Sequence, residues 1–243
     1  MQAGDNAMYA AKVAGHHRFE FFRKEMGQRA VDRLTIAQEL RSALNNEEFR
    51  LHYQPQVDVR TGEVQGWEAL VRWQHPERGL VAPADFLPEI ERLGLINELG
   101  TWVIREACQQ LAAWRAEGVD DVRMSVNVAP RQLADKQLFY VVSQAIADSG
   151  IKPEQLELEV TESGIQATED GAEVLNRLKT LGIRVAIDDF GTGYSSLGSL
   201  KYLPVDRLKI DRSFVRDMAS NAQDAVLLGT IMSLGHALKF NIV

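Results

Sequence analysis

The feature that most constrains the fold is a repeated alternation of strand-like and helix-like segments. Strand-like segments at 122–129, 155–162, 184–189 and 206–211 alternate with helical patterns at 97–116, 137–148, 169–181 and 223–238. Strands joined through a helix run parallel in one sheet, because the helix carries the chain back to the starting edge. The sequence therefore predicts an α/β fold built on a mostly parallel sheet.

Two further strand-like segments precede this series. They cover 49–59 and 63–73 and flank "RTG", a turn signal, so we expect a hairpin. A helical pattern follows at 84–93, a short one is expected near 195–202, and "FNIV" at 240–243 resembles the start of another strand. Such a strand count suits a (β/α) barrel. An open doubly wound sheet is the alternative, although no Gly-rich phosphate loop follows the first strand.

The composition is typical of a globular protein, and the acidic net charge argues against broad nucleic-acid binding. The chain has 243 residues, 45% of them hydrophobic, and a net charge of −7. It shows neither an apolar run long enough for a membrane span nor a signal-peptide pattern, so we expect no membrane contact from this segment. The single cysteine, Cys108, excludes an internal disulfide and is expected to be a buried structural thiol in a cytoplasmic protein.

Polar residues recur near the ends of successive predicted strands. Because residues two apart in a strand share a face, Glu68 lies with Leu70 and Arg72, and Lys209 lies with Asp211. Asn127, Glu159 and Asp188 take corresponding positions on the three strands between. The carboxyl ends of parallel barrel strands meet at one rim, where active sites of that architecture lie. The pattern predicts one shared polar site.

The side chains expected at this rim are mostly acidic. Converging carboxylates repel one another unless cations lie between them, and carboxylate and amide oxygens are ligands that Mg²⁺ or Mn²⁺ prefers. The adjacent pair Asp188 and Asp189 can serve two ions. Lys209 can orient water and Arg72 can hold a phosphate. The sequence favours metal-assisted phosphoester hydrolysis.

Five motifs in this order resemble those of the EAL domain family. They are "WEALVRW", "SVNVAP", "LELEVTES", "AIDDFGTGYSSL" and "VDRLKIDRSFV". The resemblance covers about residues 34–243. It implies a modified (β/α)8 TIM-type barrel that hydrolyses the bacterial second messenger cyclic di-GMP to linear pGpG with Mg²⁺ or Mn²⁺, and two ions are expected.

The resemblance also implies roles for matching residues. Glu68, Asn127, Glu159 and Asp188 would be metal ligands, with Asp189 serving the second ion and Lys209 contacting the catalytic water. Gln54, Leu70 and Arg72 would contact the dinucleotide, and Asp211 would belong to the same polar cluster. Glu162 would anchor a loop that follows Asp189, and a homodimer is expected through that loop and its neighbouring helix.

Both ends of the chain resemble parts of a longer protein. Residues 1–30, with "GDNAMYAAKVAGHHRFEFF", resemble the C-terminal end of a GGDEF (diguanylate cyclase) domain, which places the EAL domain at 31–243. The family barrel continues beyond "FNIV" with further strands, so about six barrel strands and the start of a seventh are expected here. The parent is expected to be a tandem GGDEF–EAL protein, which a membrane anchor upstream could hold.

Two other functions remain open from the sequence. The first is a cyclic di-GMP receptor that binds without hydrolysis. The second is a structural or partner-binding barrel, for which metal-dependent nucleotide binding would be absent.

Overall fold

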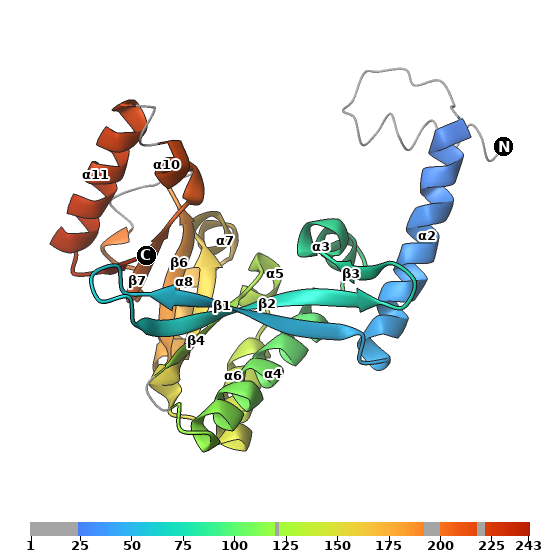
Figure 1. Cartoon of the computed structure of the whole chain (residues 1–243), viewed down its shortest axis with the longest axis horizontal. Coiled ribbons are helices and arrows are strands. Elements are labelled where there is room, and N and C mark those ends of the chain that lie inside the picture. The colour runs from blue at the N-terminus through green and yellow to red at the C-terminus, as the bar shows by residue number, and fades with distance from the viewer. Residues whose placement is uncertain (1–23, 120–121, 192–199, 218–221) are drawn as a thin grey trace. The chain divides into compact units, whose positions relative to one another are not determined.

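The computed structural model describes residues 24–119, 122–191, 200–217 and 222–243 (Figure 1). The described residues divide into two compact units, one within residues 24–49 and 73–95 and the other within residues 50–72 and 96–243. No helix among the described residues is long and apolar enough to cross a membrane. The second unit holds most of the sheet and all the predicted site residues.

The sheet follows the order β1-β2-β4-β5-β6-β7-β8, with β3 paired to β2. The strands are β1 (Phe49–Val57), β2 (Val64–His75), β3 (Gly79–Val81), β4 (Arg123–Asn127), β5 (Leu156–Thr161), β6 (Arg184–Phe190), β7 (Arg207–Ile210) and β8 (Asn241–Ile242). From β2 to β8 along this order, each neighbouring pair is parallel. Within the described part of the chain, β1 and β8 are the two ends of the order, so the sheet is open there. The predicted parallel sheet is confirmed.

Helices connect the parallel strands (Figure 1). Those of the second unit are α4 (Ile96–Ala116), α5 (Pro130–Leu133), α6 (Leu138–Ser149), α7 (Glu162–Ala167), α8 (Gly171–Lys179), α10 (Arg212–Asp217) and α11 (Ala222–Ala237), with a 3-10 turn η1 at Pro153–Gln155. The longer ones agree with the sequence patterns. The short helices α5, α7 and α10 were not predicted, because four to six residues are too few to show a helical period. Most of the short helix expected near 195–202 lies outside the described residues.

One face of the parallel strands is apolar and the other is polar. Val126, Leu158 and Ile187 are fully buried on the first face. Ser125, Glu157 and Glu159 occupy alternate positions on the other face and are buried as well. Since strand residues alternate between faces, the sequence places polar groups in the sheet's interior at regular intervals. That interior carries the predicted site.

Local sequence signals fix the element boundaries. In the β1–β2 turn, the Asp58 Oδ1 atom accepts hydrogen bonds from the backbone N–H groups of Arg60 and Thr61, at 2.8 and 3.1 Å. Gly62 follows with φ +73°, a conformation that glycine adopts without strain. The hairpin prediction is confirmed, since this turn joins β1 and β2, which are neighbours in the sheet.

Thr161 ends β5 and caps α7 by accepting the Gly164 N–H at 3.1 Å.

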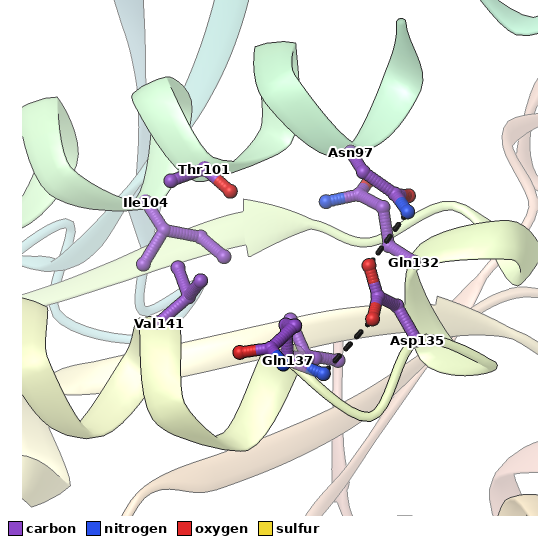
Figure 2. A pocket seen from close by; sticks show the side chains of 8 residues that line it. Asn97, Thr101, Ile104, Gln132, Asp135, Gln137 and Val141 are labelled. Carbon is purple, nitrogen blue, oxygen red and sulfur yellow. Dashed lines mark hydrogen bonds between the residues drawn. The ribbon is translucent and has the colours of Figure 1, made fainter. Parts of the chain in front are cut away.

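Helices α4 and α6 pack against each other beside a small pocket (Figure 2). Ile104 and Val141 face each other from the two helices, and Asn97 Nδ2 donates to Asp135 Oδ2 at 2.7 Å. Gln132 lies against Gly100, where an added Cβ would come within 1.7 Å of the Gln132 Nε2 atom. Gly100 is therefore required by a close approach rather than by its backbone conformation.

The first unit contains α2 (Lys24–Asn45), α3 (Pro83–Arg92), β3 and the ends of β1 and β2. Phe49, Trp73 and Phe86 form its aromatic core, with ring centroids 5.6–6.3 Å apart. Trp73 Nε1 donates to Glu48 Oε2 at 3.0 Å, which satisfies the buried indole. Helix α2 continues across the boundary at residue 30 that the sequence suggested between two domains.

Candidate active site

Five strands deliver the polar residues of the site to one place on the sheet's polar face. Glu68 comes from β2, Asn127 from β4, Glu159 from β5, Asp188 from β6 and Lys209 from β7. The strand registers align them, since Asn127 pairs with Glu159 and Thr161 pairs with Asp188 across neighbouring strands. The structure therefore brings together the residues that the sequence analysis selected.

Lys209 is the centre of this cluster. Its Nζ atom lies 3.0 Å from Glu68 Oε2 and 3.1 Å from Asp188 Oδ1, and it also donates to Glu159 Oε2. Burial alone would lower the pKa of Lys209, but the carboxylates of Glu159, Glu68 and Asp188 outweigh burial and raise it. Lys209 thus remains a cation and balances part of the acidic charge.

The three carboxylates around Lys209 have the arrangement of a metal-ligand set. One oxygen each from Glu68, Glu159 and Asp188 lie within 4.8 Å of one another. Asn127 Nδ2 donates to Glu68 Oε1 at 2.8 Å, which holds the Asn127 amide against the carboxylate group. These are hard oxygen donors, as Mg²⁺ and Mn²⁺ require.

Glu159 supplies the observation that tests whether a cation fits here. Its side chain is 1% exposed, and its Oε1 atom is buried with no hydrogen-bond partner among the described residues. Burial, together with the nearby charges of Glu68 and Asp188, raises the pKa of Glu159 to about 8 despite the opposing effect of Lys209. A buried carboxylate oxygen without a partner is energetically costly, and a divalent cation would satisfy it. The donor set fits such an ion.

Asp189 lies at the exposed edge of the same cluster. Its backbone is left-handed, with φ +52°, which is uncommon for a residue other than glycine and marks a locally constrained position. Burial raises the pKa of Asp189, and the charges of Asp188 and Asp211 raise it further. Asp189 is thus next to the carboxylate group in sequence, but it is not one of the three residues, Glu68, Glu159 and Asp188, whose oxygens lie within 4.8 Å of one another.

Asp211 is held by a residue that the sequence analysis did not select. The Asp211 Oδ1 atom accepts hydrogen bonds from the Ser213 hydroxyl and from the Ser213 N–H, the latter at 2.9 Å. These bonds lower the pKa of Asp211, so it stays ionised. The signal was a serine two residues after an aspartate at a helix start, which is typical of a cap.

The three residues expected to contact a dinucleotide lie on β1 and β2. Glu68, Leu70 and Arg72 alternate along β2, so they share a face as predicted. Arg72 is half-buried, and its Nη1 atom donates to the Val71 carbonyl at 2.8 Å. Gln54 is exposed on β1, on the face of Gln56, whose amide oxygen contacts Arg207 at 3.1 Å.

Glu162 begins α7, and its Oε1 atom accepts a hydrogen bond from Gln166 Nε2 at 3.2 Å. Its expected partner is the loop after Asp189, of which residues 192–199 lie outside the described residues. The expected role of Glu162 as the anchor of that loop, and the dimer contact expected there, therefore remain predictions.

With this geometry in place, the class of protein is an α/β domain with an acidic cluster, whose oxygen donors suit a divalent cation, on the carboxyl-end side of its parallel strands. The chain belongs to the EAL domain family, whose sequence profile matches residues 37–243.

Relatives include MucR of Pseudomonas aeruginosa, named a bifunctional diguanylate cyclase/cyclic di-GMP phosphodiesterase, and the cyclic di-GMP phosphodiesterase PdeR of Escherichia coli. MucR is 42% identical over 98% of this chain and 35% of its own length, and PdeR is 41% identical over 98% and 36%. The chain thus spans about a third of the length of these relatives.

Solved structures agree with the family and the fold. The PaMucR phosphodiesterase in complex with c-di-GMP is 42% identical, with a TM-score of 0.82 over 86% of this chain and 85% of that chain. The c-di-GMP-bound EAL domain of FimX from Pseudomonas aeruginosa is 26% identical, with a TM-score of 0.77 over 85% and 83%. The expected EAL fold, a modified TIM-type barrel, is confirmed.

Proposed function

We propose that this chain is the catalytic domain of a cyclic di-GMP phosphodiesterase that produces linear pGpG. The observation that carries the proposal is the group of three carboxylates, Glu68, Glu159 and Asp188, arranged around Lys209. Relatives over nearly the whole chain are named for this activity, and the similar PaMucR structure holds c-di-GMP.

The cofactor in this proposal is Mg²⁺ or Mn²⁺, with two ions. Glu68, Asn127, Glu159 and Asp188 would hold the first ion, and Asp189 would serve the second together with Asp188. Bound ions supply Lewis-acid activation of a phosphoryl oxygen and of water. The unpartnered Oε1 atom of Glu159 supports this assignment.

The protein's own residues orient the reaction. Lys209 is a cation held by Glu68, Glu159 and Asp188, and its positive charge can attract and orient an attacking water. Arg72 and Gln54 would bind a phosphate and a polar edge of the dinucleotide, and Leu70 would pack against it. Water then adds to phosphorus as one P–O bond to ribose breaks, which leaves a hydroxyl on one side and a phosphate on the other.

The wider setting is also part of the proposal. Residues 1–30 would be the end of a GGDEF domain and 31–243 the EAL domain of a tandem cytoplasmic signalling protein, which forms a homodimer through the loop after Asp189. The bifunctional name of MucR supports this arrangement.

The test is a turnover assay of this EAL domain in its full-length parent. We expect conversion of cyclic di-GMP to pGpG with Mg²⁺ or Mn²⁺, abolished by a chelator and by Glu68→Ala. Binding of cyclic di-GMP measured by calorimetry without any product would contradict the phosphodiesterase and favour a receptor. Absence of both binding and product would favour a structural or partner-binding domain.

A further inference from the structure

A second layer of charged residues lies on the sheet's polar face, at the end where the parallel strands begin. Arg123, Arg184 and Arg207 are the first residues of β4, β6 and β7, and Glu157 is the second residue of β5. Each lies two or four positions before a residue of the candidate active site and therefore on the same face. In barrels of this type, this end is ordinarily a stability feature and the chemistry lies at the other end.

Glu157 forms ion pairs with two of these arginines, and among the described residues it is the only carboxylate of this layer that does so. It is 0% exposed, accepts the Ser125 hydroxyl at 2.9 Å, and lies 3.6 Å from Arg123 Nε and 3.5 Å from Arg207 Nη1. The Nε atoms of both arginines are buried without a hydrogen-bond partner among the described residues. One carboxylate therefore faces two guanidinium groups whose hydrogen-bonding capacity is incompletely used.

A cavity of about 230 Å³ opens beside Arg123 at this end of the sheet. Its lining includes two further cations, Lys152 and Arg184, as well as Gln65 and Glu154. Among the described residues, neither the Lys152 ammonium nor the Arg184 guanidinium forms a hydrogen bond or an ion pair. The cavity thus gathers three cationic side chains and a single carboxylate at its wall. We call it the basic pocket.

The charge balance of the basic pocket is opposite to that of the whole protein. Arg123, Lys152, Arg184 and the neighbouring Arg207 give four positive charges against the two negative charges of Glu154 and Glu157, in a chain with a net charge of −7. Burial lowers the pKa of Arg123 to about 10, and Arg207 and Arg184 lower it further while Glu157 opposes them. Positive side chains this close together repel one another, and an anion bound between them would relieve that repulsion.

We propose that the basic pocket binds a phosphate group, either free inorganic phosphate or the terminal phosphate of a nucleotide. Guanidinium forks match pairs of phosphate oxygens, and the Lys152 ammonium adds a point charge at the mouth. Arg123 anchors the floor, because it is fixed by Glu157, while Arg184 and Lys152 are free to close on the ligand. The basic pocket lies at the opposite end of the strands from the carboxylate group, so this proposal is independent of the phosphodiesterase activity.

The experiment uses the full chain in a chelator, so that no metal at the acidic site can bind phosphate. The thermal unfolding midpoint and an isothermal titration are followed with inorganic phosphate against chloride at constant ionic strength. We expect a saturable stabilisation by phosphate, since a ligand that binds only the folded state raises the midpoint. Arg184→Gln and Lys152→Gln should each weaken phosphate binding about tenfold or more, as expected for a lost charged hydrogen bond.

Two matched variants make the result specific to the basic pocket. Glu154→Gln removes the carboxylate at its wall and should strengthen phosphate binding, because it removes a repulsion. Lys136→Gln changes the charge equally at an exposed site on the α5–α6 connection and should leave phosphate binding unchanged. Far-UV circular dichroism of each variant shows whether it is folded, which we expect because the four substituted side chains are exposed or half-buried.

The ligand's source is separated by titrating 5′-GMP and guanosine. Stabilisation by 5′-GMP but not guanosine, lost in Arg184→Gln, assigns a nucleotide phosphate, whereas binding of phosphate alone assigns the free ion. The proposal is overturned if phosphate gives no saturable response, if wild type and Arg184→Gln respond equally, or if guanosine stabilises as well as 5′-GMP.

Discussion

The Lys209 Nζ atom lies 3.1 Å from Asp188 Oδ1, so the cation of β7 is paired with an acid of the neighbouring strand β6. Glu68 and Glu159 complete this arrangement around the same ammonium group. One lysine therefore offsets three carboxylates, and the remaining negative charge is what a divalent ion would neutralise. Lys209 and a divalent ion bound at this site would thus contribute to the same charge balance.

Lys209→Met should make the folded protein depend on metal. Without the ammonium, the three carboxylates repel one another, so the unfolding midpoint in a chelator should fall, and saturating Mg²⁺ should restore most of it. Turnover should fall on the order of 10²–10⁴-fold, the usual contribution of a group that positions or transfers a proton. Thermal scans with and without Mg²⁺ and initial rates measure both effects.

The control for that variant is Lys201→Met, which removes an exposed lysine that lies over the Tyr202 ring. It should leave the midpoint and its Mg²⁺ dependence as in wild type. Equal Mg²⁺ responses in Lys209→Met and wild type would contradict the shared charge balance.

Glu159→Gln should separate metal binding from folding. The substitution removes a buried negative charge whose Oε1 atom has no partner among the described residues, so stability in a chelator should change little. The rise in unfolding midpoint on adding Mg²⁺ should instead be largely lost, because an amide is a poorer ligand than a carboxylate. Glu173→Gln on the exposed side of α8 is the matched control. A full Mg²⁺ response in Glu159→Gln would show that Glu159 is not a ligand.

The sequence predicted that five polar residues would lie close together because they follow a strict period. Glu68, Asn127, Glu159, Asp188 and Lys209 are each on the polar face of a strand, and parallel pairing aligns their strands. The position of a residue in its strand was enough to place it near the others. The distances among them, and the central place of Lys209, depend on sheet curvature and on side-chain rotamers, which the pattern does not encode.

The second charged layer shows where the period alone was insufficient. Glu157 lies on the same face as Glu159, and the pattern does not reveal that Glu157 pairs with Arg123 and Arg207 instead of joining the three carboxylates around Lys209. Both arginines stand at strand starts, where a charged residue is ordinarily solvated. Ser213 was missed because it donates to Asp211 at the start of α10, a helix too short to be recognised from its period.

Glu157→Ala should be among the most destabilising single substitutions in the chain. Removing the carboxylate leaves Arg123 and Arg207 buried beside each other without their shared partner. Breaking a buried ion pair from one side costs about 3–5 kcal/mol. Urea unfolding measures this loss, with Glu154→Ala at the exposed 3-10 turn as the control expected within about 0.5 kcal/mol of wild type. A loss below about 1 kcal/mol would mean that water replaces Glu157 at the arginines.

Cys108 should be unreactive in the folded protein and should make stability fall at high pH. The side chain is 0% exposed, and burial raises the pKa of its thiol from 9.0 to about 12. Because the pKa is higher in the folded state, the contribution of Cys108 is complete below pH 9, and it is lost as pH rises toward about 12. A thiol reagent at pH 8 should modify the urea-unfolded chain rapidly and the native chain only at the rate of unfolding. Rapid modification of native protein would contradict the burial of Cys108, and Cys108→Ala should remove this part of the pH dependence.

A pair of glycine substitutions should have opposite effects on stability. Gly100 lies in α4, where an added Cβ would meet the Gln132 Nε2 atom at 1.7 Å, and Gln132 is itself buried and accepts the Ala129 N–H at 3.0 Å. Gly100→Ala must displace that side chain, which should cost about 1–3 kcal/mol despite the better helix propensity of alanine. Gly229 lies in α11 with no atom within 4 Å of an added Cβ, so Gly229→Ala should stabilise by about 0.5–1 kcal/mol. Urea unfolding of both variants measures the two signs, and a stabilised Gly100→Ala would show that Gln132 leaves its place without cost.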